Sequence, residues 1–118
     1  MSFHLLLINW LNNSFQASLQ WQLVGSATGK TAINLPSEFN ELYIEVHCAG
    51  ASTVAFTYVI PYIVLTSEAK GYRNGAYGNT LSYSQIRLDI SKTICILSVA
   101  QDKSGDVSST TITNVYYR

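Results

Sequence analysis

Histidine is the side chain best suited to bind a metal or act as a catalytic base near neutral pH. The chain contains two, His4 and His47. A zinc site needs three or four ligands at workable spacing. Cys48 follows His47, but neighbouring side chains in a strand point to opposite faces, which counts against a shared metal ion. We therefore interpret His47 as a surface residue and predict no metal site.

No arrangement suited to covalent catalysis or glycoside hydrolysis is visible. None of the serines lies in a Gly-x-Ser-x-Gly turn. Glu41 and Glu45 share one face of a predicted strand, but four strand residues separate them by about 13 Å, which is too far for either glycosidase geometry. We expect no catalytic residues, no cofactor and no enzymatic activity.

Residues 25–31 read GSATGKT and superficially resemble a phosphate-binding loop. The spacing between the glycines is one residue shorter than the Walker pattern requires. Residues 32–36 read as a strand, so no helix follows to direct its N-terminus at a phosphate. We therefore reject nucleotide binding.

The chain carries few charges, and they are scattered. Charged residues make up 12% of it, with seven basic and seven acidic side chains, whereas about 25% is typical. Without a basic stripe, binding to nucleic acid or to an anionic membrane surface is excluded. Neutral polar groups cost less to desolvate than charges, which indicates a surface that meets other protein chains. A Ser/Thr-rich secreted or viral β-sandwich is the alternative.

Cys48 and Cys95 are the only cysteines. One pair is not a disulfide framework, and both lie in apolar strand patterns, where a free thiol behaves as a small hydrophobe. We predict that both are buried and free. A single cross-strand disulfide is the alternative, because the sequence cannot fix the distance between the two residues.

Residues 1–19 differ from the rest in their periodicity. Steps of three and four residues predict a helix with one apolar stripe. The stripe consists of Leu5, Ile8, Leu11, Phe15 and Leu19. A lone helix of this length is marginal in water, so it needs a partner, either the domain itself or copies of the same helix. The five stripe residues are the candidate oligomer interface, and a coiled-coil neck is one possibility, although about two heptads are fewer than the usual evidence for one. The apolar run is too short to span a membrane and is a poor secretory signal.

From residue 20 to 118 the period changes to two, which predicts a second unit built from about eight short strands. The clearest strand is 41–48, with Leu42, Ile44, Val46 and Cys48 on one face. Strand 93–100 is apolar on both faces, which is typical of a central strand covered on both sides. Residues 66–80 read as a glycine-rich loop around a short strand at 73–77. The spacing of strands and turns favours an all-β fold, an antiparallel β-sandwich of jelly-roll type.

Three tyrosines fall in or near that glycine-rich passage. Exposed tyrosines make good contact anchors, since two torsions carry a large amphipathic area. The candidate ligand-binding residues are Tyr72, Arg73, Tyr77 and Tyr83. The alternative is that the rings cap the core, with their hydroxyls in water.

Four segments carry a resemblance to a known class of protein: WQLVGSATG (21–29), LPSEFNELY (35–43), YRNGAY (72–77) and VYYR (115–118). Together they resemble the C-terminal domains of head-fibre or tail-fibre-like structural proteins from phages and prophages of Gram-positive bacteria. In such proteins the domain usually follows a helical segment, and INWLNN (8–13) looks like the end of one. The start, Met-Ser-Phe-His, departs from that pattern.

The resemblance implies a homotrimeric virion component, encoded by a phage or a prophage. Its terminal domain would face a host cell-surface glycan or protein, or would contact neighbouring virion proteins. The resemblance carries over no catalytic residue. A monomeric carbohydrate-binding module is the alternative function, because exposed aromatic rings could stack on sugars without any oligomer.

Overall fold

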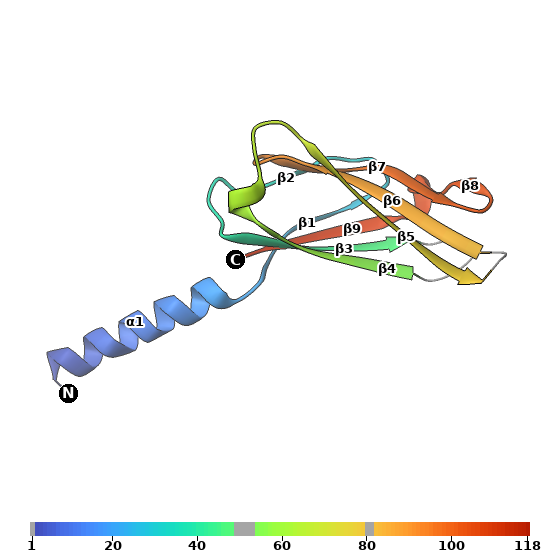
Figure 1. Ribbon diagram of the computed structural model, residues 1–118. Helices are drawn as coiled ribbons and strands as arrows, with labels where there is room; N and C mark the ends of the chain where they lie inside the picture. Colours follow the sequence, from blue (N-terminus) through green and yellow to red (C-terminus); the bar gives the residue numbers. More distant parts are fainter. Residues whose placement is uncertain (1, 49–53, 80–81) are drawn as a thin grey trace.

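The computed structural model describes residues 2–48, 54–79 and 82–118, and it describes their side chains except at 12–19, 54, 77–79 and 82–83. A two-layer β-sandwich forms the body of the molecule, and one helix projects from its end (Figure 1). The whole measures 66 × 29 × 20 Å. The predicted N-terminal helix and β-sandwich are therefore both present.

Helix α1 spans Phe3–Leu19, as the spacing of its apolar residues predicts. Ser2 caps its start, because the Ser2 Oγ accepts a hydrogen bond from the Leu5 amide at 3.2 Å. The chain enters the first strand three residues after the helix ends. The helix therefore extends away from the sandwich instead of packing on it (Figure 1).

All strand pairs in the two sheets are antiparallel. The first sheet has the order β1-β9-β3-β4 and the second has the order β2-β7-β6-β5, with β8 pairing β7. The first sheet contains β1 (Gln22–Thr28), β3 (Glu41–Cys48), β4 (Val54–Pro61) and β9 (Ile112–Tyr117). The second contains β2 (Ile33–Asn34), β5 (Lys70–Asn79), β6 (Ser82–Ile90), β7 (Ile94–Asp102) and β8 (Gly105–Asp106). The predicted all-β sandwich is confirmed, with nine strands in place of about eight.

The core lies between the two sheets and is built by the alternation that the sequence shows. The inward residues of β3 are fully or almost fully buried, as are those of β6. They are Leu42, Ile44, Val46, Cys48, Ile86, Leu88 and Ile90. Phe39, in the turn before β3, also packs against this core. Burial of one face of each sheet accounts for the period of two.

Two strand predictions need correction, and both have a physical reason. The short strand predicted at 73–77 is present, but it extends over ten residues as β5 and replaces most of the predicted loop at 66–80, because its backbone pairs with β6 from Lys70↔Ile90 to Asn79↔Ser82. Strand β7 is not covered on both faces: Ile94 is 36% exposed. A two-layer sandwich has no third layer to cover the outer face of β7. Residues 49–52 read AGAS in the sequence, which predicts a hairpin turn after the strand at 41–48, and they lie outside the described residues.

Candidate functional site

Helix α1 presents an uncharged apolar surface to solvent. Its sequence contains no Asp, Glu, Lys or Arg, and every described side chain from Ser2 to Leu11 is exposed. The predicted stripe residues Leu5, Ile8 and Leu11 are among them, while the side chains of Phe15 and Leu19 lie outside the described part. These exposed side chains are accessible to a partner, but a single chain does not test whether they form an oligomer interface. That interface therefore stays a prediction.

The apolar surface of the helix is wider than the predicted stripe. Leu6 and Trp10 are also exposed, Trp10 by 63%, and at 100° per residue they lie on the side opposite Ile8. Apolar side chains therefore lie on more than one side of the described part of α1, although Asn9 interrupts them. The predicted stripe omits Leu6 and Trp10 because it follows a single face.

A row of apolar and aromatic side chains crosses the outer face of the first sheet. Leu23 on β1 lies opposite Tyr116 on β9, which lies opposite Tyr43 on β3, which in turn lies opposite Val59 on β4. Leu23 is 58% and Val59 57% exposed. Trp21 extends this group, with its ring centroid 5.7 Å from that of Tyr43. We call these five residues the aromatic row.

The aromatic row begins where the helix ends. Trp21 lies two residues after Leu19, where α1 ends, so the row starts beside the junction between the helix and the sheet. The Arg118 guanidinium lies 4.3 Å from the Trp21 ring centroid, and its Nε donates a hydrogen bond to Glu41 Oε1. The Arg118 charge at the border of the aromatic row is therefore paired with the Glu41 carboxylate. Sequence reasoning missed the row because its members come from four separate strands.

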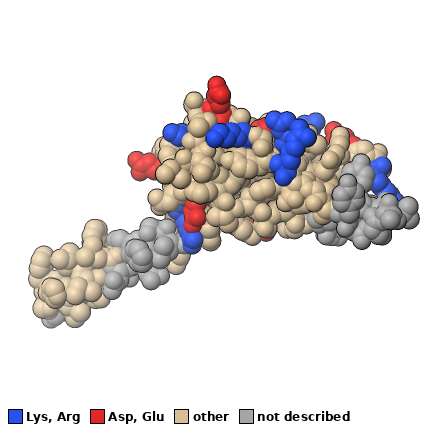
Figure 2. Space-filling view, viewed as in Figure 1, with Lys and Arg blue, Asp and Glu red and all other residues tan. Residues whose placement is uncertain are grey.

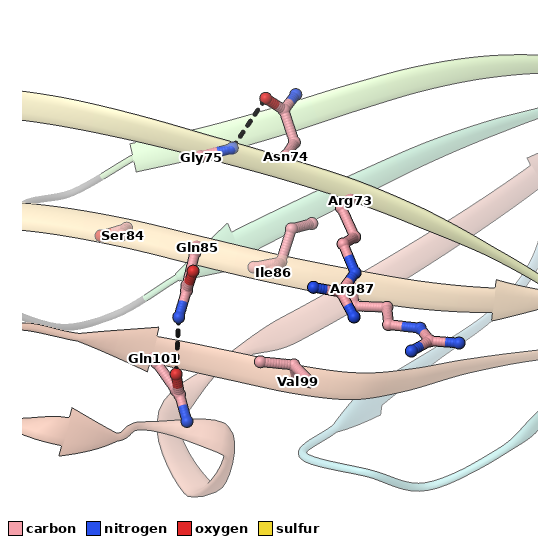
Figure 3. A pocket seen from close by; sticks show the side chains of 9 residues that line it. All are labelled: Arg73, Asn74, Gly75, Ser84, Gln85, Ile86, Arg87, Val99 and Gln101. Atoms are coloured by element: carbon pink, nitrogen blue, oxygen red, sulfur yellow. Dashed lines mark hydrogen bonds between the residues drawn. The ribbon is translucent and has the colours of Figure 1, made fainter.

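The outer face of the second sheet is different and carries a polar depression of about 560 Å³. Arg73 on β5 and Arg87 on β6 are directly opposed in register, and Figure 3 shows both side chains over this face. On the same face Gln85 Nε2 donates to Gln101 Oε1 at 2.6 Å. We call the side chains of Arg73, Gln85, Arg87, Val99 and Gln101 with the backbone of Gly75 the arginine groove. In the view of Figure 2, Lys and Arg gather over this sheet, whereas the described part of α1 shows no charge.

The predicted ligand-binding residues are not brought together as a loop site. Tyr72 and Arg73 are adjacent in β5 and therefore face opposite sides: Tyr72 packs against the core, while Arg73 lines the arginine groove. Tyr77 and Tyr83 lie in β5 and β6, not in a loop, and are cross-strand partners. Their side chains are outside the described part.

Comparison of the chain with family models, with curated proteins and with solved structures finds no match. Within the described residues, no three His, Cys, Asp or Glu side chains gather as a metal site requires, and no helix there is long and apolar enough to cross a membrane. His47 is exposed, with its Nε2 3.6 Å from Glu45 Oε2. The exposed helix, the aromatic row and the arginine groove are candidate surfaces for a function.

Both cysteines are free and buried, as predicted, and burial raises the pKa of the Cys95 thiol to about 12. Between pH 9 and 12 the unfolded chain loses this proton while the folded chain keeps it, so stability falls as pH rises through this window. Near pH 10 we expect the Cys95 thiol to lower the free energy of unfolding by about 1.4 kcal/mol relative to its value below pH 9. Urea unfolding at pH 8 and pH 10 measures this change in the free energy of unfolding.

The Cys95→Ala variant is the control for the other groups that titrate in the same range. It should be less stable than the parent at both pH values, because it leaves a small cavity. Between pH 8 and pH 10 its free energy of unfolding should fall by less than that of the parent. An equal loss in both proteins would show that Cys95 does not contribute.

Proposed function

We propose that this chain is a non-enzymatic, fibre-type structural module of a phage particle. Three copies associate through helix α1 and the aromatic row, and the sandwich is left to contact a host surface or neighbouring virion proteins. The observation that carries the proposal is the exposed, uncharged helix α1, whose described side chains are largely apolar, with the aromatic row starting two residues after its end. The sequence resemblance to fibre-type domains supplies the phage setting and the number of copies.

The composition of the helix supports a second copy of the same chain as its partner. In a parallel symmetric assembly, each residue on the contact face lies close to its own copies, so a charge there would face the same charge. Helix α1 contains no charged side chain in its 17 residues, so its copies meet without this repulsion. A helix of this length gains most of its stability from packing, which association provides.

The aromatic row does not form a flat platform of several rings for sugar stacking. The rings of Trp21 and Tyr43 are inclined by 46°, and those of Tyr43 and Tyr116 by 47°. Tyr and Trp side chains are enriched at protein interfaces, which agrees with a protein partner. A sugar can stack on a single ring, so the carbohydrate-binding alternative is left to a direct binding test.

Sedimentation of the intact chain tests the proposal. We expect a species of three 13.0 kDa copies at micromolar concentration. The Leu23→Lys variant should raise the dissociation midpoint about tenfold or more, because it places an unpaired charge in the interface. Ser109→Lys adds the same charge at an exposed position in the 3-10 helix Ser108–Thr110 and should leave assembly unchanged.

A strictly monomeric chain at high micromolar concentration would overturn the proposal. The monomeric carbohydrate-binding alternative would then be tested by a glycan array with neutral sugars. If both lysine variants weaken assembly equally, the effect is one of net charge and the aromatic row is not part of the interface.

A further inference from the structure

Two arginines face each other on the outer side of the second sheet, although the chain has few charges. Arg73 and Arg87 occupy directly opposed positions on β5 and β6, and only seven basic residues exist in the whole sequence. Like charges at such cross-strand positions are destabilising. An anion bound between them would remove this repulsion.

The Arg87 side chain is held in place by its surroundings. Its Nε donates to Asp89 Oδ1 at 3.0 Å. A Cβ on Gly71 would lie 2.6 Å from this Nε, so the guanidinium lies against the backbone of β5 only because residue 71 has no side chain. The group is therefore oriented before any ligand arrives.

The Arg73 side chain has no such restraint. Within the described residues its guanidinium makes no ion pair with a carboxylate, and it extends over β6 toward Arg87 (Figure 3). With one carboxylate for two guanidinium groups, the arginine groove keeps one positive charge. The planar fork of donors on a guanidinium matches carboxylate and phosphate oxygens, which it can bind with two parallel hydrogen bonds.

The rest of the groove suits a ligand rich in hydroxyl groups. Gln85 and Gln101 place amide donors and acceptors beside the arginines, and Val99 adds an apolar contact. The volume of about 560 Å³ is in the range of small-ligand sites. Amides that can donate and accept, next to a cationic pair, are well matched to a sugar that carries an acid.

We propose that the arginine groove binds an oxyanion on a carbohydrate polymer, either the carboxylate of an acidic sugar or the phosphate of a polyol-phosphate chain. This site would give a ligand class to the host-attachment role proposed above, and in that respect it rests on that role. The groove and the aromatic row lie on the outer faces of different sheets, so binding and assembly can be measured separately.

Calorimetric titration of the intact chain tests the proposal with three probes: an oligogalacturonate, a glycerol-phosphate oligomer and neutral maltohexaose. At least one anionic probe should bind about tenfold or more tightly than maltohexaose, because charge-assisted hydrogen bonds contribute a factor of ten or more. The tighter of the two anionic probes identifies the source of the oxyanion.

Binding of the anionic probe to single-residue variants distinguishes a specific site in the arginine groove from general electrostatic attraction to the protein. Arg73→Gln and Arg87→Gln should each weaken the bound anionic probe about tenfold or more. Lys103→Gln removes the same charge from an exposed turn and should change binding less than about twofold, because exposed charges are screened by solvent and salt. Gly71→Ala keeps the charge but displaces the Arg87 guanidinium, and it should also weaken binding.

Three results would overturn the proposal. One is the absence of binding of either anionic probe at millimolar concentration, and another is equal weakening by Lys103→Gln and Arg73→Gln. The third is equal binding of a single-stranded DNA oligomer, which would show a general polyanion surface. Sedimentation of the same samples keeps the two proposals apart, because Arg73→Gln should leave assembly intact. Its unfolding temperature should equal or exceed that of the parent, since one of two opposed charges is gone.

Discussion

Replacement of Ile8 by aspartate is expected to convert the proposed trimer to monomers without lowering the unfolding temperature of the sandwich. Ile8 lies between Leu5 and Leu11 in the predicted stripe and is exposed in the single chain. In a trimer, each copy would lose the burial of this side chain, which contributes about 1.5–3 kcal/mol, and the three new carboxylates would repel one another. Sedimentation measures the loss of assembly and far-ultraviolet circular dichroism follows the sandwich on heating.

Asn9→Asp is the matched control for this substitution. It adds the same carboxylate one residue further along, 100° around the helix from Ile8, and Asn9 is also exposed. We expect it to weaken assembly much less than Ile8→Asp does. Equal loss in both variants would mean that any charge on α1 opposes assembly, and the stripe would then not be the contact face. If Ile8→Asp stays assembled, the helix does not hold the copies together.

Alternation along the sequence was sufficient to predict the core of the sandwich. Leu42, Ile44 and Val46 are buried on β3 because one face of each sheet meets the other sheet and the opposite face meets solvent. This rule is local, since it depends only on the direction of successive side chains in a strand. The same applies to α1, where steps of three and four residues are enough to indicate a helix.

Strand β5 could not be predicted in the same way. A residue elsewhere in the chain explains why the strand contains a glycine at position 71. Gly71 and Gly75 read as loop residues in the sequence. In the structure Gly71 faces the guanidinium of Arg87, sixteen positions later, at a distance that excludes a Cβ. A glycine in a strand often marks such a close approach, but the partner is known only once β5 and β6 are paired.

The two exposed surfaces of the sandwich depend on strand order, which the sequence does not state. The aromatic row brings together Trp21, Tyr43 and Tyr116 because β9, the last strand, lies between β1 and β3. The opposition of Arg73 and Arg87 likewise depends on the register between β5 and β6. Each residue looks ordinary in its own segment, so the sites arise only from long-range pairing.

Leu88→Ala is expected to destabilise the sandwich by about 2–5 kcal/mol, because it removes a fully buried side chain and leaves a cavity. Leu88 lies on β6, an interior strand of the second sheet, with Tyr72 on β5 and Leu97 on β7 as its cross-strand partners. Neighbours held by two paired strands cannot easily move in to fill the space. For a sandwich of about this size the loss corresponds to a fall of roughly 10–20 °C in Tm or more.

The measurement is cleanest in chains that also carry Ile8→Asp, since association of the folded form would otherwise add a concentration-dependent stability. In that background Leu23→Ala, which shortens an exposed side chain, should change the free energy of unfolding by no more than about 0.5 kcal/mol. Leu88→Met keeps most of the volume and should cost less than about 1.5 kcal/mol. If Leu88→Ala costs no more than Leu23→Ala, residue 88 does not lie between two sheets. The alternation that places Leu88 inward also places Arg87 outward, so the arginine groove would then lose its structural basis as well.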